Sequence, residues 1–226
     1  IEEDAISIDL SKRPFSIVTT TQNIKSNSLI ISTGASANRL GLKNEKSFWS
    51  KGISACAICD GATPQFRNEE LAVVGGGDSA CEEAEYLTKY GSHVHLLVRS
   101  NKLKASAAMA DRVEANSNIT IHWETELLDV LGNEWLEKLK VKRKNTKQED
   151  EILAKGLFYA IGHTPNTSLF TNQLSTDSKG YLLTEPGRPE TSLEGVYAAG
   201  DVADSEWRQG VTAAGSGCKA ALAAEG

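Results

Sequence analysis

Short apolar runs that recur along the first half of the chain predict a mixed α/β protein. Two β-rich runs at residues 5–10 and 15–20 predict a hairpin, and an apolar run from residue 28 predicts a third strand that ends at Gly34. Residues 71–74 form a short apolar strand, and three glycines at 75–77 follow it. Apolar residues at 80, 84 and 87 then repeat with helical spacing, with Asp78 or Ser79 as the expected N-cap and Gly91 as the expected end. With the strand at 93–99, this is a right-handed βαβ unit of a parallel sheet.

The second half of the chain adds further elements of both kinds. A helix is expected at 106–116 and a strand at 119–123. Runs at 127–132, 135–144 and 151–162 predict antiparallel strands, with a solvated charged turn at 144–150. A strand at 195–201 and a small-residue helix at 208–225 follow. Because no Pro/Gly-rich linker separates these parts, we expect two interleaved Rossmann-like, three-layer domains that exchange strands, with chain crossings near residues 37 and 160.

Composition narrows the possible partners. The chain has 226 residues, 40% of them hydrophobic and 24% charged, which is typical of a globular protein with real cores. The net charge is −6 and no Lys/Arg cluster stands out, which argues against nucleic acid or an anionic membrane as a partner. No apolar stretch approaches the roughly 18 residues that a membrane helix needs.

A close pair of cysteines raises the question of redox chemistry. Cys56 and Cys59 lie two residues apart in SACAICDG, and Asp60 follows at once. Four cysteines are few for a secreted disulfide scaffold, and a structural zinc site usually takes two close pairs where this chain has one. His93 and His95 alternate along a predicted strand, so we interpret them as an ordinary sheet face and expect no metal site. The spacing favours a redox pair, with an inert pair in a core as the alternative.

The glycine-rich turn predicts a nucleotide. Gly75, Gly77 and Ala80 form a G-x-G-x-x-A pattern between a strand and a helix, where a pyrophosphate approaches the backbone and the helix N-terminus. A plain tight turn is the alternative. The next strand ends at Val98 without the acidic residue usual for NAD, and cations follow it. Arg99, Lys102 and Lys104 suit a 2′-phosphate and favour NADP, unless they form only a solvated basic loop.

The motifs occur in an order that resembles a known family. STGAS, AICDG, GGGDSA, AIGHTPN, GVYAAGDV and RQGVTAAGSGC resemble low-molecular-weight, FAD-containing NADPH–thioredoxin reductases over nearly the whole chain. AICDGATP, YLTKYGSHVHLLVR and EWRQGVTAAGSGC are most similar to the plastid form, which has a thioredoxin domain fused at its C-terminus. The resemblance implies a homodimeric enzyme that passes electrons from NADPH through FAD and a disulfide to thioredoxin or a fused thioredoxin domain. It suggests a chloroplast location, with the cytoplasm as the alternative.

The resemblance also assigns the domains. Residues 1–37 and 160–226 would belong to the FAD domain, and residues 38–159 to the NADPH-binding domain with the redox cysteines. In this family the ADP half of FAD rests on an earlier βαβ unit. We therefore expect the FAD domain to be incomplete and the chain to be a fragment that lacks this N-terminal lobe.

Residue roles follow from the same resemblance. Cys59 would face the flavin, Cys56 would attack the disulfide of thioredoxin, and Asp60 would donate and accept the proton. Asp201 would bind the ribityl chain, and Arg208, Gln209 and Gly210 would lie at the isoalloxazine. Ser79 would bind the NADPH phosphates, and Ile161 and Tyr181 would lie near the nicotinamide nucleotide, although a core role for Ile161 is the alternative. The other cofactor-binding residues implied are Thr33, Gly34, Ala35, Gly75, Gly76, Gly77, Asp78, Ala80, Arg99, Lys104 and Gly200.

Some positions depart from the family pattern. Ser100 and Lys104 stand where the family usually has arginines, so the preference for NADPH over NADH is expected to be weakened. Gly210 stands where most members have alanine. Cys81 and Cys218 occupy small-residue helical positions and are interpreted as packing residues. Two rival functions remain: a relative fed by ferredoxin or another reductant, against which the intact GGGDSA argues, and a non-catalytic NADP-binding fragment.

Overall fold

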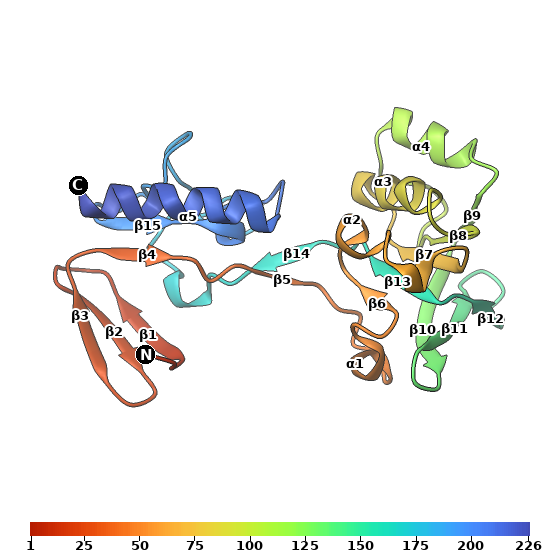
Figure 1. Cartoon of the computed structure of the whole chain (residues 1–226), viewed down its shortest axis with the longest axis horizontal. Coiled ribbons are helices and arrows are strands. Elements are labelled where there is room, and N and C mark those ends of the chain that lie inside the picture. Colours follow the sequence, from red (N-terminus) through yellow and green to blue (C-terminus); the bar gives the residue numbers. More distant parts are fainter. The chain divides into compact units, whose positions relative to one another are not determined.

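The chain folds into two compact units, one of which is built from two separate segments of the chain. The computed structural model describes all 226 residues (Figure 1). Unit 1 consists of Ile1–Ser36 and His163–Gly226, and unit 2 of Ala37–Gly162. Where the chain passes between the units, β5 (Ala35–Ala37) pairs with β14 (His163–Pro165). The two chain crossings therefore lie at residues 36–37 and 162–163.

A five-stranded parallel sheet forms the centre of unit 2. Its order is β6 (Ile53–Ser54), β13 (Gly156–Tyr159), β7 (Glu70–Val74), β8 (His93–Leu97) and β9 (Ile119–His122). The helix α3 (Asp78–Leu87) connects β7 to β8, so the predicted βαβ unit is present. The helices α3 and α4 (Ala107–Glu114) cover one face of this sheet (Figure 1). Ala80, Ala84 and Leu87 of α3 pack there against buried residues of β7 and β8.

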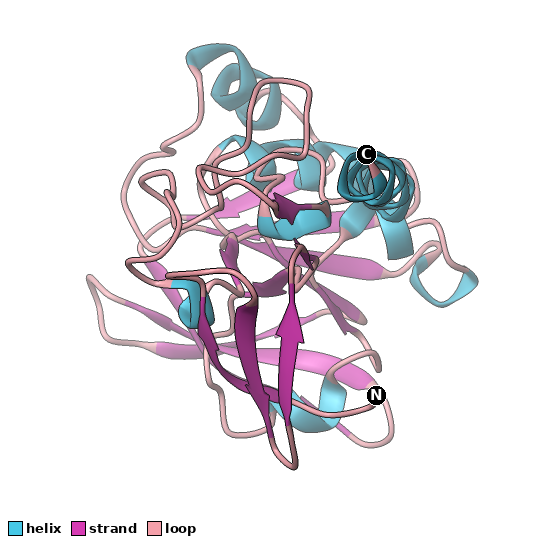
Figure 2. Cartoon of the chain, turned by 90° about the vertical axis from the view of Figure 1, so that its left-hand side faces the viewer, coloured by secondary structure: helices cyan, strands magenta, loops and turns pink.

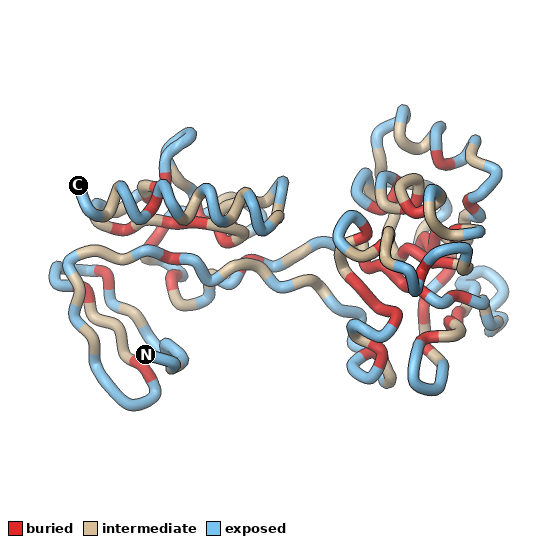
Figure 3. The backbone as a smooth tube through the Cα atoms, in the orientation of Figure 1, coloured by how far each residue is buried: buried red, intermediate tan, exposed pale blue.

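An antiparallel sheet covers the other face of the parallel sheet. It consists of β10 (Thr125–Gly132), β11 (Leu136–Arg143) and β12 (Glu149–Leu153). Leu127, Val130 and Leu139 of this sheet share one core with Ala72 and Leu157 of the parallel sheet. Unit 2 is thus a three-layer, Rossmann-like domain, in agreement with the prediction. Figure 3 shows the buried residues concentrated in these strands.

The sequence interpretation of residues 151–162 was wrong. This run contains two strands of different sheets: β12 pairs antiparallel with β11, whereas β13 lies parallel between β6 and β7. All four residues of β13 are buried. A strand covered on both faces reads as a continuous apolar run and belongs in a central parallel position. Gly156 is required there, because a Cβ would lie 2.8 Å from the side chains of both Leu71 and Phe66.

Unit 1 contains smaller sheets and the longest helix (Figures 1 and 2). The strands β1 (Ala5–Asp9), β2 (Phe15–Thr19) and β3 (Asn23–Ser26) form an antiparallel sheet, which includes the predicted hairpin. The third of these strands was not predicted, because NIKS is mostly polar. The strand β4 (Leu29–Ile31) pairs in parallel with β15 (Val196–Ala198), and α5 (Gly210–Glu225) packs on both.

Short helices complete the two units. Unit 2 contains α1 (Glu45–Phe48), α2 (Ala57–Asp60) and the 3₁₀ helix η1 (Pro64–Phe66), and unit 1 contains the 3₁₀ helices η2 (Ser168–Phe170) and η3 (Gly200–Val202). Of the two remaining cysteines, Cys81 is fully buried in α3, which confirms its packing role. Cys218 is exposed on α5, so its interpretation as a packing residue was wrong. No helix in the structure has the length and apolar character required to cross a membrane.

Candidate functional site

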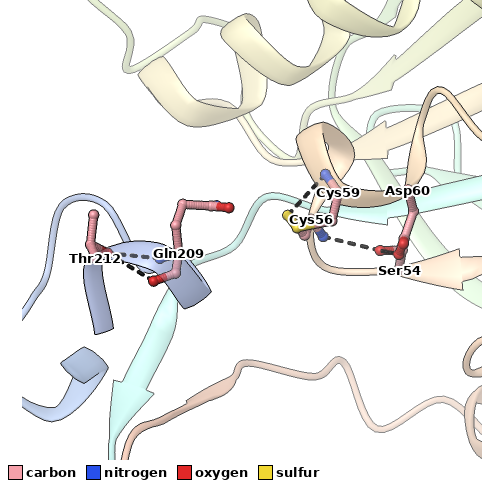
Figure 4. Close-up of a disulfide and its surroundings, with 6 residues drawn as sticks. All are labelled: Ser54, Cys56, Cys59, Asp60, Gln209 and Thr212. Atoms are coloured by element: carbon pink, nitrogen blue, oxygen red, sulfur yellow. Dashed lines mark hydrogen bonds between the residues drawn. A yellow bond between two sulfur atoms is a disulfide. The ribbon is translucent and has the colours of Figure 1, made fainter. Parts of the chain in front are cut away.

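The two close cysteines form a disulfide at the start of α2. Cys56 and Cys59 are joined, with their Cα atoms 5.3 Å apart (Figure 4). Cys56 is the N-cap of α2, and its sulfur accepts a hydrogen bond of 3.2 Å from the backbone N–H of Cys59. Cys56 is half-buried and Cys59 is exposed. An attacking thiolate can reach a sulfur at such a position, as thiol–disulfide exchange requires.

The surrounding elements fix this disulfide in unit 2. The strand β6 at the edge of the parallel sheet ends at Ser54, two residues before Cys56. On the other side of α2, a Cβ at Gly61 would lie 2.6 Å from both the backbone oxygen of Ala57 and the side chain of Leu87. Glycine therefore allows α2 to pack closely against α3, and the motif CDG requires its glycine for steric reasons.

Asp60 directly follows the disulfide and has a specific partner. The hydroxyl of Ser54 donates a hydrogen bond of 2.6 Å to Oδ2 of Asp60. The same hydroxyl oxygen accepts a hydrogen bond of 3.1 Å from the backbone N–H of Cys56. Ser54 was not predicted from the sequence, in which its only signal is a hydroxyl residue two positions before the first cysteine.

The glycine-rich turn has the shape that a nucleotide phosphate needs. Gly75 has φ +154°, and a Cβ there would lie 2.5 Å from the backbone oxygen of Ala160 and 2.7 Å from Cβ of Ala80. A Cβ at Gly77 would meet nothing within 4 Å, so the backbone is open at this point. Gly77 is the N-cap of the ten-residue helix α3 and no side chain caps the first turn. Open backbone at a helix N-terminus fits a pyrophosphate group.

The predicted N-cap of α3 was wrong. The carboxylate of Asp78 instead accepts a hydrogen bond of 2.8 Å from the backbone N–H of Ser106, and this bond lowers the pKa of Asp78. A second bond of 2.6 Å joins the backbone N–H of Lys104 to the oxygen of Gly76. The loop that carries the predicted cations is therefore tied to the glycine-rich turn. Arg99 and Lys104 are both exposed in it.

Unit 1 brings together polar groups from three motifs. Gly200 has φ +74°, and its N–H donates to the hydroxyl of Ser216 at 2.8 Å. Nδ1 of His163 is buried and has no hydrogen-bond partner. Burial lowers the pKa of His163, the nearby charge of Arg208 lowers it further, and Asp201 opposes this effect. A buried ring nitrogen without a partner, close to an acid and a base, fits a polar cofactor such as FAD.

The segment Thr33–Ala35 lies against the IGHTPN motif, and the segment 208–210 starts α5. The hydroxyl of Thr33 donates to the backbone oxygen of Asn166 at 2.7 Å, and the N–H of Asn166 donates to the oxygen of Gly34 at 2.9 Å. At the start of α5, the N–H of Gln209 donates to the hydroxyl of Thr212 at 3.3 Å, and this hydroxyl donates to the oxygen of Gln209 at 2.8 Å (Figure 4).

Comparisons with known proteins agree with these features. The family model "Pyridine nucleotide-disulphide oxidoreductase" matches residues 1–217. Thioredoxin reductase 1 of Saccharomyces cerevisiae is 50% identical over 230 residues, which cover 100% of this chain and 72% of the yeast protein. The chain belongs to the thioredoxin reductase family. This family depends on FAD and NADPH, and the resemblance deduced from the motifs is confirmed at this level.

Two further thioredoxin reductases define the extent of the similarity. NADPH-dependent thioredoxin reductase 3 of Arabidopsis thaliana is 56% identical over 225 residues, but these cover 99% of this chain and only 42% of the plant protein. The solved structure of thioredoxin reductase from Giardia duodenalis is 43% identical with a TM-score of 0.89, and the match covers 100% of this chain and 74% of that one. This chain therefore spans about two fifths to three quarters of the length of its thioredoxin reductase relatives.

Two residues expected near the nicotinamide nucleotide lie in different units. Ile161 packs against the core between the two sheets of unit 2, as the alternative interpretation expected. Tyr181 belongs to unit 1, where 4% of its surface is exposed. Contact of either residue with a nucleotide stays a prediction.

Cys81 has no access to a partner thiol, and burial raises its pKa to about 11.

A buried network in unit 2 was also not predicted. The hydroxyl of Tyr159 donates a bond of 2.6 Å to Oε1 of Glu45, and both residues are buried. The backbone N–H groups of Leu40 and Gly41 donate to the same carboxylate. Glutamate is rarely fully buried, so neither its burial nor its partners could be read from the sequence.

Proposed function

We propose that this chain carries the electron path of an NADPH-dependent thioredoxin-disulfide reductase. Electrons would pass from NADPH through FAD to the Cys56–Cys59 disulfide and then to a disulfide of thioredoxin. The observation that carries the proposal is the surface disulfide, which lies in the same unit as the glycine-rich turn. Family membership supports it, because the relatives are thioredoxin reductases.

The cysteines would act in a defined order. Bound FAD would relay the two electrons of NADPH, which with one additional proton convert the disulfide into two thiols. Cys56 as thiolate would attack one sulfur of the thioredoxin disulfide, form a mixed disulfide and release the first thiol. Cys59 would then attack the sulfur of Cys56, restore the disulfide and release the second thiol. Asp60 would accept a thiol proton and return it to the leaving sulfur. In sum, NADPH, one proton and one disulfide give NADP⁺ and two thiols.

The two cofactors would bind to different units. Unit 2 would bind NADPH, with the pyrophosphate at Gly77 and Ser79 and the 2′-phosphate near Arg99 and Lys104. The open backbone at Gly77 and the uncapped start of α3 support this assignment. Unit 1 would hold part of FAD at Gly200, Asp201, the segment 208–210 and the segment 33–35, and the unpartnered Nδ1 of His163 supports a polar occupant there.

The subtype is a narrower proposal. We assign the chain to the plastid type with a thioredoxin domain, in a homodimer in the chloroplast. The identity of 56% to the Arabidopsis relative, against 50% to the yeast relative, supports the plant type. A fluorescent fusion of the complete gene product would test the location, and a cytoplasmic signal would contradict the assignment. Sedimentation of the complete protein would test the dimer.

The decisive experiment counts the thiols that form when thioredoxin is reduced. The complete protein is mixed with FAD, NADPH and oxidised thioredoxin, and the new thiols are counted after alkylation. Cys56→Ser should abolish thioredoxin reduction, whereas Cys81→Ala, which changes a buried cysteine outside the disulfide, should leave it nearly unchanged. NADPH binding, measured by calorimetry, should persist in both variants.

The rival functions predict other outcomes. NADPH binding without any thiol formation, also in the longer protein, would indicate a non-catalytic nucleotide-binding protein. Thiol formation with another reductant but not with NADPH would indicate a related reductase that takes its electrons from another donor.

A further inference from the structure

The carboxylate of Asp60 is held by one buried hydroxyl group. Ser54 is the last residue of β6, and 8% of its surface is exposed. Its hydroxyl donates to Oδ2 of Asp60 at 2.6 Å, a short distance that is typical of a bond to a charged acceptor. Figure 4 shows the two side chains pointing toward each other beside the disulfide.

The hydroxyl oxygen of Ser54 also contacts the backbone of Cys56. It accepts the N–H of Cys56 at 3.1 Å, so one atom joins Cys56 to the carboxylate of Asp60. The position of Ser54 is fixed, because it pairs in the parallel sheet with Phe158 of the fully buried strand β13. The carboxylate is thereby connected to the buried centre of the parallel sheet and to the first residue of the redox pair.

A hydroxyl group suits a partner that changes its protonation state. It carries one donor hydrogen and two acceptor lone pairs. It can donate to the carboxylate of Asp60 and, after a half turn of its hydrogen, accept from the protonated acid. In both states one lone pair remains for the N–H of Cys56. A backbone N–H or a lysine could serve only the ionised state.

We propose that Ser54 is a positioning residue that keeps Asp60 aligned with the cysteine pair in both of its protonation states. The inference rests on the proposed function, in which Asp60 receives the thiol proton as the cysteine attacks a disulfide and gives it to the leaving sulfur. Ser54 exchanges no proton with the substrate in this scheme. Its loss should slow proton-coupled thiol–disulfide exchange because the carboxylate leaves its position.

The experiment follows the cysteine pair alone and needs no cofactor. The chain, carrying Cys218→Ala to remove the exposed free thiol, is reduced with dithiothreitol and desalted. It is then mixed with oxidised glutathione, whose leaving sulfur takes up a proton at neutral pH, and the rate at which the two cysteine thiols are lost is measured by alkylation over a range of pH. Ser54→Ala should react about tenfold more slowly near neutral pH, as expected for a lost hydrogen bond to a charged, positioned group. The shape of its pH profile should change, which a merely structural role would not cause.

A double-mutant cycle shows whether Ser54 acts through Asp60. Asp60→Asn should slow the reaction, and the double variant Ser54→Ala/Asp60→Asn should be no slower than Asp60→Asn alone. Thr63→Ala is the matched control in the same turn. Its hydroxyl bonds to the backbone oxygen of Asp60 at 2.7 Å, but its N–H also bonds there at 2.9 Å, so the oxygen keeps a partner. The rate of this control should change less than about twofold.

The outcomes separate the two proposals. If Asp60→Asn reacts at the unaltered rate, the acid–base role of Asp60 is wrong, and the inference on Ser54 falls with it. If Asp60→Asn is slow while Ser54→Ala is not, or if the two effects multiply, only the inference on Ser54 is overturned. Should Ser54→Ala fail to fold, Ser54→Thr and Ser54→Val replace it, because they share a shape and differ in the hydroxyl. Thr should then retain the rate and Val should lose it.

Discussion

Acid should weaken unit 2 through one half-buried histidine. His122 ends β9 and its Nε2 lies 3.0 Å from Nδ1 of His95, whose Nε2 lies 3.0 Å from Oε2 of Glu70. Burial lowers the pKa of His122 from 6.5 to about 4, and the charges of His95, Arg143 and His93 act in the same direction. The folded chain therefore keeps this ring neutral at pH values where an unfolded chain would protonate it.

The sign and size of the effect follow from proton linkage. Between pH 6.5 and about 4 the unfolded chain binds more protons at this position, so the stability contributed by neutral His122 is complete above 6.5 and is lost toward 4. At about 1.36 kcal/mol per pH unit the lowered pKa corresponds to at most about 3 kcal/mol. Because the ring is partly exposed to solvent, we expect about 1 to 2 kcal/mol.

Tryptophan fluorescence can measure this loss in unit 2 alone. Trp49, Trp123 and Trp135 belong to unit 2, and Trp207→Phe removes the only tryptophan of unit 1. In this background, urea unfolding is measured at about pH 7 and about pH 4.5. His122→Gln, which cannot titrate, should lose about 1 to 2 kcal/mol less between the two pH values than the chain with His122.

A second histidine provides the control for this measurement. His163→Gln changes a histidine of unit 1 and should leave the difference between the two pH values in place. Carboxylates elsewhere in the chain also lower the free energy of unfolding in acid. They do so equally in all variants, so their contribution cancels in the comparison. Equal acid sensitivity with His122 and with Gln at this position would refute the reasoning.

Three further changes test the packing and the nucleotide site. Tyr159→Phe removes the bond of 2.6 Å to the buried Glu45 and should lower the urea stability of unit 2 by about 1 to 3 kcal/mol; an unchanged midpoint would contradict the buried bond. Gly75→Ala should strongly destabilise unit 2, because a Cβ would lie 2.5 Å from a backbone oxygen, whereas Gly77→Ala should fold and weaken NADPH binding in calorimetry. Ser100→Arg should increase the preference for NADPH over NADH in titrations at low salt, since a guanidinium can bind the 2′-phosphate; an unchanged ratio would remove this position from the site.

The elements that the sequence predicted well are those with a local cause. The βαβ unit around the glycine-rich turn could be recognised because strand, turn and helix periodicity follow one another within some thirty residues. The close spacing of Cys56 and Cys59 similarly limits them to a few arrangements, and the disulfide is one of them. The failures have a different cause. Leu153 and Gly156 lie three positions apart, but the chain changes sheets between them, and only the partners of each strand distinguish the two.

The contacts that position the site were hidden for a related reason. The backbone N–H groups of Lys104 and Ser106 connect the loop after β8 to the glycine-rich turn. Because every residue except proline has a backbone N–H, such a contact cannot be predicted from residue types. This also explains why Asp78 failed as an N-cap: its carboxylate holds this loop instead, and the helix start remains open at the position where a pyrophosphate would bind. Ser54 follows the same logic, since a buried hydroxyl at a strand end acquires meaning only when the fold brings Asp60 to it. Motifs thus indicate candidate reacting groups, whereas the hydrogen bonds that hold these groups become visible only in the folded chain.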